Sequence, residues 1–549
     1  MALKPPLTDL PINTADSGFY AGFSRDVTIA SKFIIGGLVI WAVAFPEQAG
    51  SVLNTFNSFI LSNFATWYIW TVALFVLICI ALAIWPAAGK LNLGQPGDKP
   101  EFSNFSWFSM MFGAGIGVGM LTWAVAEPVY HFQNNPEVIK GITTGSSADN
   151  VRMAYKWSFL HWGLGAWACY AIAGLALAFF SYRRNLPLTI RSSLTPLFGK
   201  SLSGPMGHVI DIVAVVATIL GVAQTLGFGV EQFVSGLSRV GIGGLTGEDG
   251  TANTLGILVA IFIIMGASTI SALSGVGKGI KWLSNLNMGL SIFLLSFFLI
   301  FGSTFFGLQA LVLGLWDYFI ALPDMMFRVW RTDGVEGSVA SQLEGWQGGW
   351  SVFYWAWWVA FAPFVGLFLA RISKGRSIRE FVLGAMFVPS LMCFVWFTWA
   401  GGTAIDLTLN GDAGEAIFGV PDGDKIFAMV VHMLGSALGW AMSVIIVVLL
   451  MTYLVTTADS AVLIVNTINA AGDEGPKARP HIIFWGVTLG AVVAALLIVG
   501  GLKAIQTAMV IGALPFSLVM VLMCFALVKA IYNDGRREKA GMDTHVPAE

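Results

Sequence analysis

Two clusters of aromatic residues are the features of this sequence most suited to binding a ligand. The first lies in the run from His161 to Tyr170, where Trp162, Trp167 and Tyr170 are separated by small residues. At about 100° per residue, Trp167 and Tyr170 lie about 140° and 80° around a helix from Trp162. The three rings therefore share one half of such a helix, and the small residues between them leave room for a ligand.

The second cluster places Tyr354, Trp357, Trp358 and Phe361 at i, i+3, i+4 and i+7, which makes one helix face almost wholly aromatic. A quaternary ammonium or tertiary sulfonium group cannot donate a conventional hydrogen bond, and ring faces bind such a cation with about 2 kcal/mol each when it is desolvated. The two clusters predict a cage for a methylated onium group. The alternative is that many of the 21 tryptophans are interfacial anchors or lipid-facing bulk.

A polar patch, Thr452 to Ser460, interrupts a long apolar stretch. Its hydroxyls, together with unwound backbone carbonyls, would form a hard-oxygen site suited to Na⁺. Serine and threonine in membrane helices more often bond to carbonyls of their own helix. Asp459 in the same patch is by default functional, since a carboxylate inside a membrane is costly, but it could equally be a structural acceptor near the cytoplasmic mouth.

Other polar groups give weaker signals. Thr218, Gln224 and Thr225 form a second, sparser set, and Glu127, before Pro128, is expected to be a helix-end or vestibule residue. None of the six histidines is expected to pair with a carboxylate or a second histidine as a metal site, and no nucleophile motif or phosphate loop is found. The sequence therefore favours no enzyme chemistry.

The elements that must position these residues lie in lipid. The chain has 549 residues, of which 56% are hydrophobic and 11% charged, far more apolar than a soluble core requires. Its four cysteines lie in apolar runs and are expected to be buried thiols. The N-terminus does not have the pattern of a cleavable signal peptide, and the net charge of −2 gives no reason to expect nucleic acid as a partner.

Twelve membrane-spanning helices are predicted, since a span requires about 20 apolar residues. Most of the 29 basic residues fall on one side of these spans, which predicts both termini in the cytoplasm. The tenth span is too long for one straight crossing and is expected to tilt or to continue into the cytoplasm. The predicted spans are 27–46, 64–86, 105–127, 153–181, 207–238, 254–273, 285–308, 350–371, 381–402, 428–468, 482–501 and 505–531.

Glycines and prolines indicate interrupted helices. The third span contains four glycines at alternate positions from Gly113 to Gly119, which either break the helix beside a cavity or allow close helix packing. The fifth span repeats the theme with Gly221, Gly227 and Gly229, and the eighth contains Pro363. If two extra helices are set aside, interrupted helices begin both groups of five, as an inverted-repeat transporter predicts.

This pattern predicts an all-α polytopic membrane protein in six sections. The segment 309–349 is too polar to cross and is expected to be an amphipathic helix on the outer surface or an ordinary packed loop. The sections are a cytoplasmic tail 1–26, two extra helices and a loop 27–104, a first five-helix repeat 105–308, the outer segment 309–349, a second repeat 350–531 and a cytoplasmic tail 532–549.

At five places the residues resemble the betaine/choline/carnitine transporter (BCCT) family, and the similarity extends over all twelve predicted spans. The resemblance implies a leucine-transporter-type fold, a homotrimer in the bacterial inner membrane, and a small zwitterionic or cationic onium solute as substrate. The motifs are Gly113 to Gly119, Trp162 to Tyr170, Tyr354 to Trp358, Ala370 to Arg376 and Thr456 to Ser460.

The resemblance also assigns substrate-binding positions. It places Trp162, Trp167, Tyr170 and Trp358 in the substrate cage, a set called the aromatic cage below. Trp357 and Phe361 would line the permeation route, where sodium-coupled betaine carriers of the family have Trp in place of Phe361. Ile116 and Gly117 of the glycine run are included as further substrate contacts.

One sodium site implied by the resemblance combines the hydroxyls of Thr456 and Thr457 with backbone oxygens of Gly113, Ile116 and Tyr453. A weaker second site would use Thr218 and Phe364, with Thr225 nearby, but this chain has Val222 where the family's sodium carriers have a further threonine.

Sodium-independent exchangers of the family have an arginine near the start of the seventh span, whereas no arginine occurs here between Arg239 and Arg328. We therefore expect sodium-coupled uptake of glycine betaine, dimethylsulfoniopropionate, choline or carnitine, with Na⁺ as the coupling ion. The alternatives are a sodium-independent exchanger and a proton-coupled choline-type carrier of the same family. Because both tails are short, osmotic gating through a charged tail is not expected. A channel would require a repeated pore loop and a sensor an extra soluble domain, and neither is present in the sequence.

Overall fold

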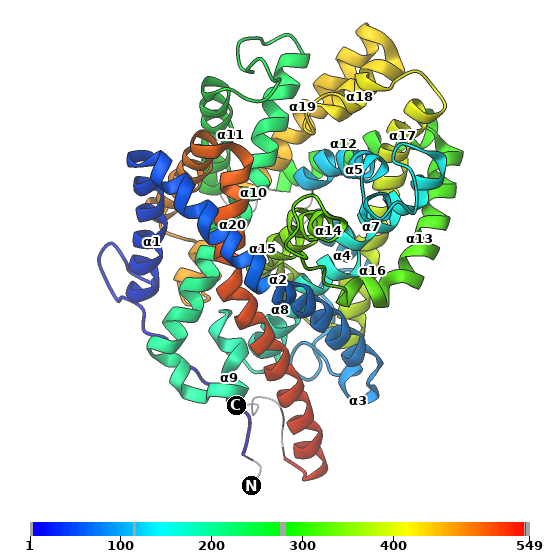
Figure 1. The fold of residues 1–549 in the computed structure, drawn as a ribbon. Helices are drawn as coiled ribbons and strands as arrows, with labels where there is room; N and C mark the ends of the chain where they lie inside the picture. Colours follow the sequence, from blue (N-terminus) through cyan, green and yellow to red (C-terminus); the bar gives the residue numbers. More distant parts are fainter. Residues whose placement is uncertain (1–3, 114–116, 275–280, 543, 545–549) are drawn as a thin grey trace.

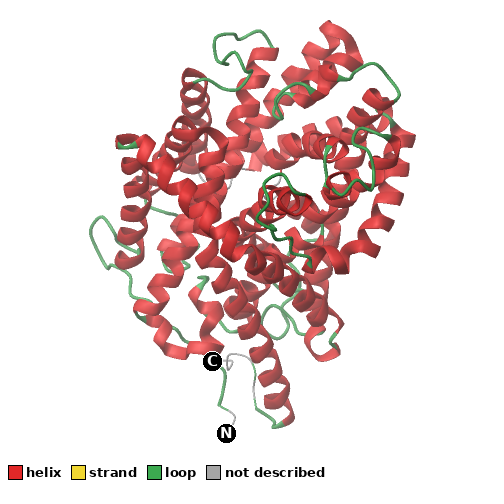
Figure 2. Cartoon of the chain, in the orientation of Figure 1, coloured by secondary structure: helices red, strands yellow, loops and turns green. Residues whose placement is uncertain are grey.

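The protein is built from α-helices, as the apolar sequence predicts. The computed structural model describes residues 4–113, 117–274, 281–542 and 544, and these residues contain no β-strand, only three isolated bridges. Helices fill the molecule, with loops at its two ends (Figure 1, Figure 2). Both described termini lie at the same end of the molecule (Figure 1), which agrees with an even number of crossings.

The N-terminal half holds the first two long helices and the first group of core helices. Its helices are α1 (Arg25–Ala44), α2 (Pro46–Ile84), α3 (Pro86–Gly89), α4 (Asn104–Gly113), α5 (Gly117–Gln133), α6 (Pro136–Ile139), η1 (Ala148–Asn150), α7 (Val151–Trp162), α8 (Leu164–Ala178), η2 (Phe179–Arg183), η3 (Arg191–Leu194), α9 (Thr195–Phe198), η4 (Gly199–Ser203), α10 (Pro205–Arg239), α11 (Thr254–Ser274) and α12 (Lys281–Phe301).

The C-terminal half begins with the helix of the predicted outer segment. Its helices are α13 (Thr304–Phe327), α14 (Val339–Gln347), η6 (Gly348–Val352), α15 (Phe353–Ile372), α16 (Ile378–Trp396), η7 (Phe397–Gly401), α17 (Gly402–Leu409), α18 (Glu415–Phe418), α19 (Lys425–Asn469) and α20 (Arg479–Lys539).

The start of several helices follows from local sequence. Proline occupies the first turn of α2, α10 and α20, where its missing N–H group is not needed. Ser377 and Glu380 form a reciprocal capping box at the start of α16. These signals fix where the helices begin, while burial in lipid and against neighbouring helices holds them together.

Eleven helices of the described residues are long and apolar enough to cross a membrane. The predicted number of twelve is therefore not confirmed. The third predicted span is divided between α4 and α5, and the residues between them, which include Ile116, lie outside the described part of the chain. The last two predicted spans are one assigned helix, α20, with non-helical backbone at Gly500 and Gly501.

Two expected helix interruptions need correction. The fifth predicted span is a continuous helix, α10, and α15 runs unbroken through Pro363. A Cβ atom added at Gly221 would lie 2.9 Å from the backbone carbon of Ala360 in α15. This glycine therefore allows close approach of two helices, the second of the two alternatives raised by the glycine pattern.

The breaks in the described helices occur elsewhere. Gly163 separates α7 from α8 in the middle of the fourth predicted span, with φ −93° and ψ −141°. Gly435 has φ 73° inside α19, a conformation that glycine adopts without a steric penalty. The break at Gly435 divides the long tenth span near its start, and the helix then continues to Asn469.

The outer segment begins with a long helix, and its place on the outer surface stays a prediction. A helix is present, but α13 has the length and the apolar composition of a membrane-spanning helix. Its exposed face is apolar and includes Phe305, Trp316 and Ile320, whereas Gly307 and Gly314 lie on its buried face. The segment is thus suited to contact with lipid along its length.

The core of the molecule is formed where α5, α8, α10, α15 and α19 meet. α15 packs against α8 and α10, and α10 also packs against α19 and α5. These helices come from both predicted repeats, so the first and third helices of each repeat lie in one bundle. The four cysteines are buried free thiols, as expected.

We predict that the buried ion pair between η3 and α10 is required for stability. The Arg191 guanidinium donates to Asp211 Oδ2 at 2.6 Å, and both side chains are at most 1% exposed. Asp211→Asn leaves a buried cation without its counter-charge, which should cost about 3 kcal/mol. Thermal unfolding in detergent micelles, followed by tryptophan fluorescence, measures the loss.

The matched control is Asp324→Asn, which removes one partner of the exposed Arg328–Asp324 pair. An exposed ion pair contributes less than about 1 kcal/mol. Equal midpoints for the two variants would contradict a structural role for the buried pair.

Candidate functional site

The structure brings together the aromatic rings that the sequence singled out. The end of α7 carries Trp162, α8 carries Trp167 and Tyr170, and α15 carries Trp358. The Trp162 and Trp358 ring centroids lie 5.1 Å apart with planes at 72°, and the Tyr170 and Trp358 centroids lie 6.1 Å apart at 78°. Trp167 contacts Tyr170 at 5.5 Å and 82°. All three contacts are edge-to-face, an arrangement that the ring quadrupoles favour.

Trp357 and Phe361 lie at the border of the aromatic cage. Trp357 stacks on Trp358 with centroids 4.7 Å apart, and Phe361 lies 6.3 Å from Tyr170. All six rings are at most 3% exposed. The cage is therefore shielded from solvent, where a cation–π contact is strongest.

The helix break at Gly163 separates the ring of Trp162 from those of Trp167 and Tyr170. Trp162 ends α7, and Trp167 and Tyr170 lie on α8, which begins after the break. The hydroxyl of Tyr318 in α13 accepts a hydrogen bond from the Leu164 backbone N–H at 3.1 Å. One of the unpaired N–H groups at the start of α8 is thereby satisfied by a helix outside the core.

Glycines of α5 lie beneath the rings and beside α19. A Cβ atom at Gly119 would lie 3.0 Å from Trp162 Cη2 and 3.3 Å from Trp357 Cη2. A Cβ atom at Gly117 would collide with the ring of Tyr453. The predicted substrate contact Gly117 thus connects the glycine run to the predicted sodium residues, while Ile116 lies outside the described residues.

The Glu127 carboxylate forms a hydrogen-bond network that sequence reasoning missed. Glu127 is fully buried, and its Oε2 accepts from Trp162 Nε1 at 2.6 Å and from the Tyr354 hydroxyl. Its Oε1 lies 2.7 Å from His161 Nδ1 and 3.3 Å from His131 Nε2. The carboxylate orients a cage ring directly, so Glu127 is not the helix-end or vestibule residue that was expected.

The expectation that no histidine pairs with a carboxylate or a second histidine was also wrong. Glu127, His131 and His161 offer three ligating atoms within 4.8 Å of one another, and no other such group is found among the described residues. The i, i+4 spacing of Glu127 and His131 is the one signal of this cluster in the sequence. His161 comes from a different helix, and only the fold could place it there. Glu127 contacts both imidazoles, while His131 Nδ1 is buried and has no partner among the described residues.

Two further hydrogen bonds hold the cage rings in place. Trp358 Nε1 donates to the His161 carbonyl at 2.9 Å, and Trp357 Nε1 donates to Thr225 Oγ1 at 3.2 Å. The Tyr170 hydroxyl, in contrast, is buried and has no partner among the described residues. A buried polar group without a partner costs about 1–3 kcal/mol, so this hydroxyl is available to a ligand.

Three of the predicted first sodium residues, Tyr453, Thr456 and Thr457, lie together on α19. Thr456 Oγ1 donates to backbone carbonyls of Thr452 and Tyr453 and accepts from Asn287 Nδ2 at 3.0 Å. Thr457 is buried, with no hydrogen bond described for its hydroxyl. Gly113, the last residue of α4, would supply one backbone oxygen of this site.

The residues of the second predicted sodium site have fewer side-chain oxygens free to bind an ion. Thr218 Oγ1 donates to the Ala214 carbonyl of its own helix at 2.7 Å, and Thr225 already accepts from Trp357. Phe364 is buried and lies 5.0 Å from the ring of Phe361. Gln224 is buried, and neither amide atom has a partner among the described residues.

Asp459 is held by neighbouring hydroxyls. Ser271 of α11 donates to its Oδ2 at 2.6 Å, and Ser460 donates to its Oδ1 at 3.1 Å. The bond from Ser271 ties α11 to α19, whereas Ser460 lies on the same helix as Asp459.

The loop after α15, one of the resemblance motifs, is anchored by Arg376. Its guanidinium lies 3.8 Å from the Trp107 ring centroid and donates to Asn104 Oδ1 and to the Phe102 carbonyl. Burial lowers the pKa of this guanidinium from its usual value. The loop thereby fixes the start of α4, which leads into the glycine run.

Comparisons with known proteins identify a matching family model and several related transporters. The model of the "BCCT, betaine/carnitine/choline family transporter" family matches residues 26–536. A "Probable glycine betaine transporter" of Desulfitobacterium hafniense is 37% identical over 90% of this chain and 95% of its own length. The glycine betaine transporter OpuD of Bacillus subtilis is 36% identical over 92% and 94%.

A high-affinity choline transport protein of Escherichia coli is 38% identical over 88% of this chain and 68% of its own length. Together with the family match along nearly the whole chain, this shows that the protein belongs to the betaine/carnitine/choline transporter family, whose members are membrane transporters and not enzymes.

Proposed function

We propose that this protein is a sodium-coupled transporter that takes up a methylated onium solute carrying a carboxylate. Glycine betaine, carnitine and dimethylsulfoniopropionate fit this description, and choline fits the onium part alone. The observation that carries the proposal is the buried aromatic cage together with the unpartnered Tyr170 hydroxyl. Family membership supports the onium class.

The cage suits a group that has charge but no hydrogen-bond donor. Desolvating a cation requires compensation, and each ring face can supply about 2 kcal/mol in a buried setting. The four rings come from α7, α8 and α15 and meet at centroid separations of 5.1–6.1 Å. A carboxylate on the same solute could accept from the Tyr170 hydroxyl and remove the cost of its isolation.

Coupling to sodium is supported by the arrangement of α5 and α19. Gly117 packs on Tyr453, and the Thr456 and Thr457 hydroxyls lie within one turn of that residue. A movement of α5 would shift Gly119 against the cage rings. The same movement would shift the first turn of α5 relative to the Thr456 and Thr457 hydroxyls. Binding of the ion and of the solute would then favour the same conformation, which is the basis of alternating access.

A proton-coupled carrier is the second candidate, and the Glu127 network favours it. The network contains one carboxylate and two imidazoles, so it can gain or lose a proton while it remains bonded to Trp162. The inner-membrane location with cytoplasmic termini and the trimeric assembly stay predictions of the resemblance.

We expect uptake by purified protein in liposomes to require an inward sodium gradient. Uptake of labelled glycine betaine, dimethylsulfoniopropionate, choline and carnitine is measured with and without a sodium gradient and with and without a pH gradient. A further assay loads the liposomes with unlabelled solute to detect exchange. Sodium-dependent, saturable uptake is expected. Uptake that follows the pH gradient alone would favour the proton-coupled carrier, and counterflow without sodium would identify an exchanger.

We expect Trp358→Ala to abolish solute binding, since it removes a cage ring that contacts both Trp162 and Tyr170. Loss of one ring face corresponds to about 2 kcal/mol, or roughly 30-fold in affinity, and loss of the shared packing adds to this. The control is Trp316→Ala, which removes an exposed ring of α13. Quenching of tryptophan fluorescence by solute measures affinity, and an unchanged affinity in Trp358→Ala would refute the cage.

Glu127→Gln should weaken solute binding without removing the rings. The substitution replaces one acceptor oxygen by a donor and removes charge-assisted hydrogen bonds to Trp162 and Tyr354, at about 1.5–3 kcal/mol, or roughly 10- to 100-fold in affinity. If the network carries a transported proton, the variant also loses the pH dependence of uptake. If the variant keeps the affinity and the pH profile of the natural protein, the network does not position any group that binding requires.

A further inference from the structure

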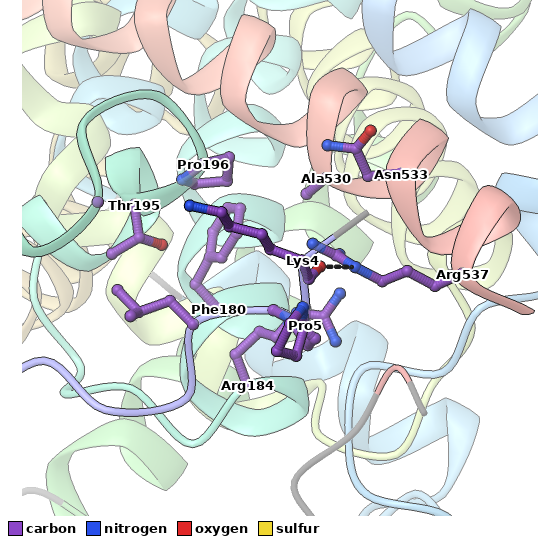
Figure 3. Close-up of a pocket in the computed structure, with 12 residues that line it drawn as sticks. Lys4, Pro5, Phe180, Arg184, Thr195, Pro196, Ala530, Asn533 and Arg537 are labelled. Atoms are coloured by element: carbon purple, nitrogen blue, oxygen red, sulfur yellow. Dashed lines mark hydrogen bonds between the residues drawn. The ribbon is translucent and has the colours of Figure 1, made fainter. Parts of the chain in front are cut away.

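A cavity far from the cage lies at the end of the molecule that holds both termini. Its volume is ≈ 290 Å³, near the lower end of the size range of small-molecule sites, about 300–1,000 Å³. The N-terminal tail, the chain around η2 and α9, and the end of α20 enclose it (Figure 3). Its described lining is Lys4, Pro5, Pro6, Leu7, Phe180, Arg184, Thr195, Pro196, Gly199, Ala530, Asn533 and Arg537.

The charged groups that line this cavity are all positive among the described residues. Lys4, Arg184 and Arg537 contribute cations, and no carboxylate lines the cavity. Arg184 and Arg537 both bind a single carboxylate behind them, that of Asp534, which is fully buried. Arg183 Nε lies 3.7 Å from the same carboxylate. One negative charge is thus shared among three guanidiniums, and Lys4 adds a fourth cation.

Arg184 has a hydrogen-bond donor left over. Its side chain is 1% exposed, one nitrogen donates to Asp534, and the other, Nη1, has no partner among the described residues. Burial lowers the pKa of Arg184, and Asp534 offsets this in part. Arginine nevertheless stays charged in proteins. A buried cation with a free N–H group and excess positive charge around it favours an anion in the adjacent space.

The remaining lining limits the kind of anion. Thr195 and Asn533 supply a hydroxyl and an amide, while Leu7, Phe180 and the prolines form apolar walls. Arginine forks match the tetrahedral oxygens of phosphate especially well, and lysine adds a point charge. The site offers several donors on one side and an apolar surface on the other.

We propose that this cavity binds a phosphate group, supplied either by an anionic phospholipid headgroup or by a soluble phosphate. The bound phosphate would contact Arg184, Arg537 and Lys4 together. Arg537 Nε already donates to the Lys4 carbonyl at 2.9 Å (Figure 3), so the ligand would fasten the N-terminal tail to the end of α20. The site is separate from the aromatic cage and does not depend on which solute is transported.

The test compares the natural protein with Lys4→Gln and Arg184→Gln. Lys4 is exposed, so its variant leaves the fold unchanged, while Arg184→Gln removes the unpartnered donor. Lys90→Gln is the matched control, because Lys90 is also exposed and basic and does not line the cavity. Two probes are used: inorganic phosphate added to delipidated protein in detergent, and nanodiscs of phosphatidylglycerol against phosphatidylcholine.

Thermal unfolding with phosphate, against chloride at equal ionic strength, measures the soluble ligand, and native mass spectrometry of protein released from nanodiscs measures retained lipid. If phosphate stabilises the natural protein and its apparent affinity is about tenfold lower for Lys4→Gln, the result supports the site with soluble phosphate as the ligand. Retention of phosphatidylglycerol that falls several-fold in Lys4→Gln, with Lys90→Gln unchanged, supports it with a lipid source. Binding of neither probe, or equal loss in Lys90→Gln, overturns the proposal.

Discussion

The architecture of the site depends on a buried carboxylate under an aromatic ring. Glu127 belongs to α5, but it accepts hydrogen bonds from Trp162 of α7 and Tyr354 of α15. A carboxylate in a dry interior is tolerated only when its lone pairs are filled, and here indoles, phenols and imidazoles fill them. The same bonds fix the position of each donor, so the desolvated charge organises three helices around the cage.

Close helix approach is the second constraint, and glycine and alanine provide it. Gly119 lies against Trp162 and Trp357, and Gly117 lies against Tyr453. Within lipid there is no hydrophobic force between helices comparable to that in water, so packing of small residues against large ones contributes much of the association. The cage rings fit because the residues opposite them have no side chain to occupy their space.

Sequence patterns predicted the helical class, the boundaries of most spans and the meeting of two aromatic faces. Helix periodicity is a local property, which is why the spacing of Trp357 and Trp358 was enough to predict that they share one aromatic helix face. The role of Glu127 could not be predicted in this way, because its partners Trp162 and Tyr354 lie on other helices. Glycine patterns were equally ambiguous: Gly221 allows packing, whereas Gly163 breaks a helix, and the difference depends on neighbours such as Ala360. The sodium residues stay a prediction.

The bond between Tyr318 and the start of α8 has a mechanical consequence. Trp162 and the Trp167–Tyr170 pair lie on opposite sides of Gly163, so widening the cage by tilting one half-helix changes the geometry at Leu164 N–H. The hydroxyl that satisfies this group belongs to α13, a helix whose outer face is suited to lipid. A tilt at the break must either stretch that bond or carry α13 along, which couples movement of the half-helices to a helix with an apolar exposed face.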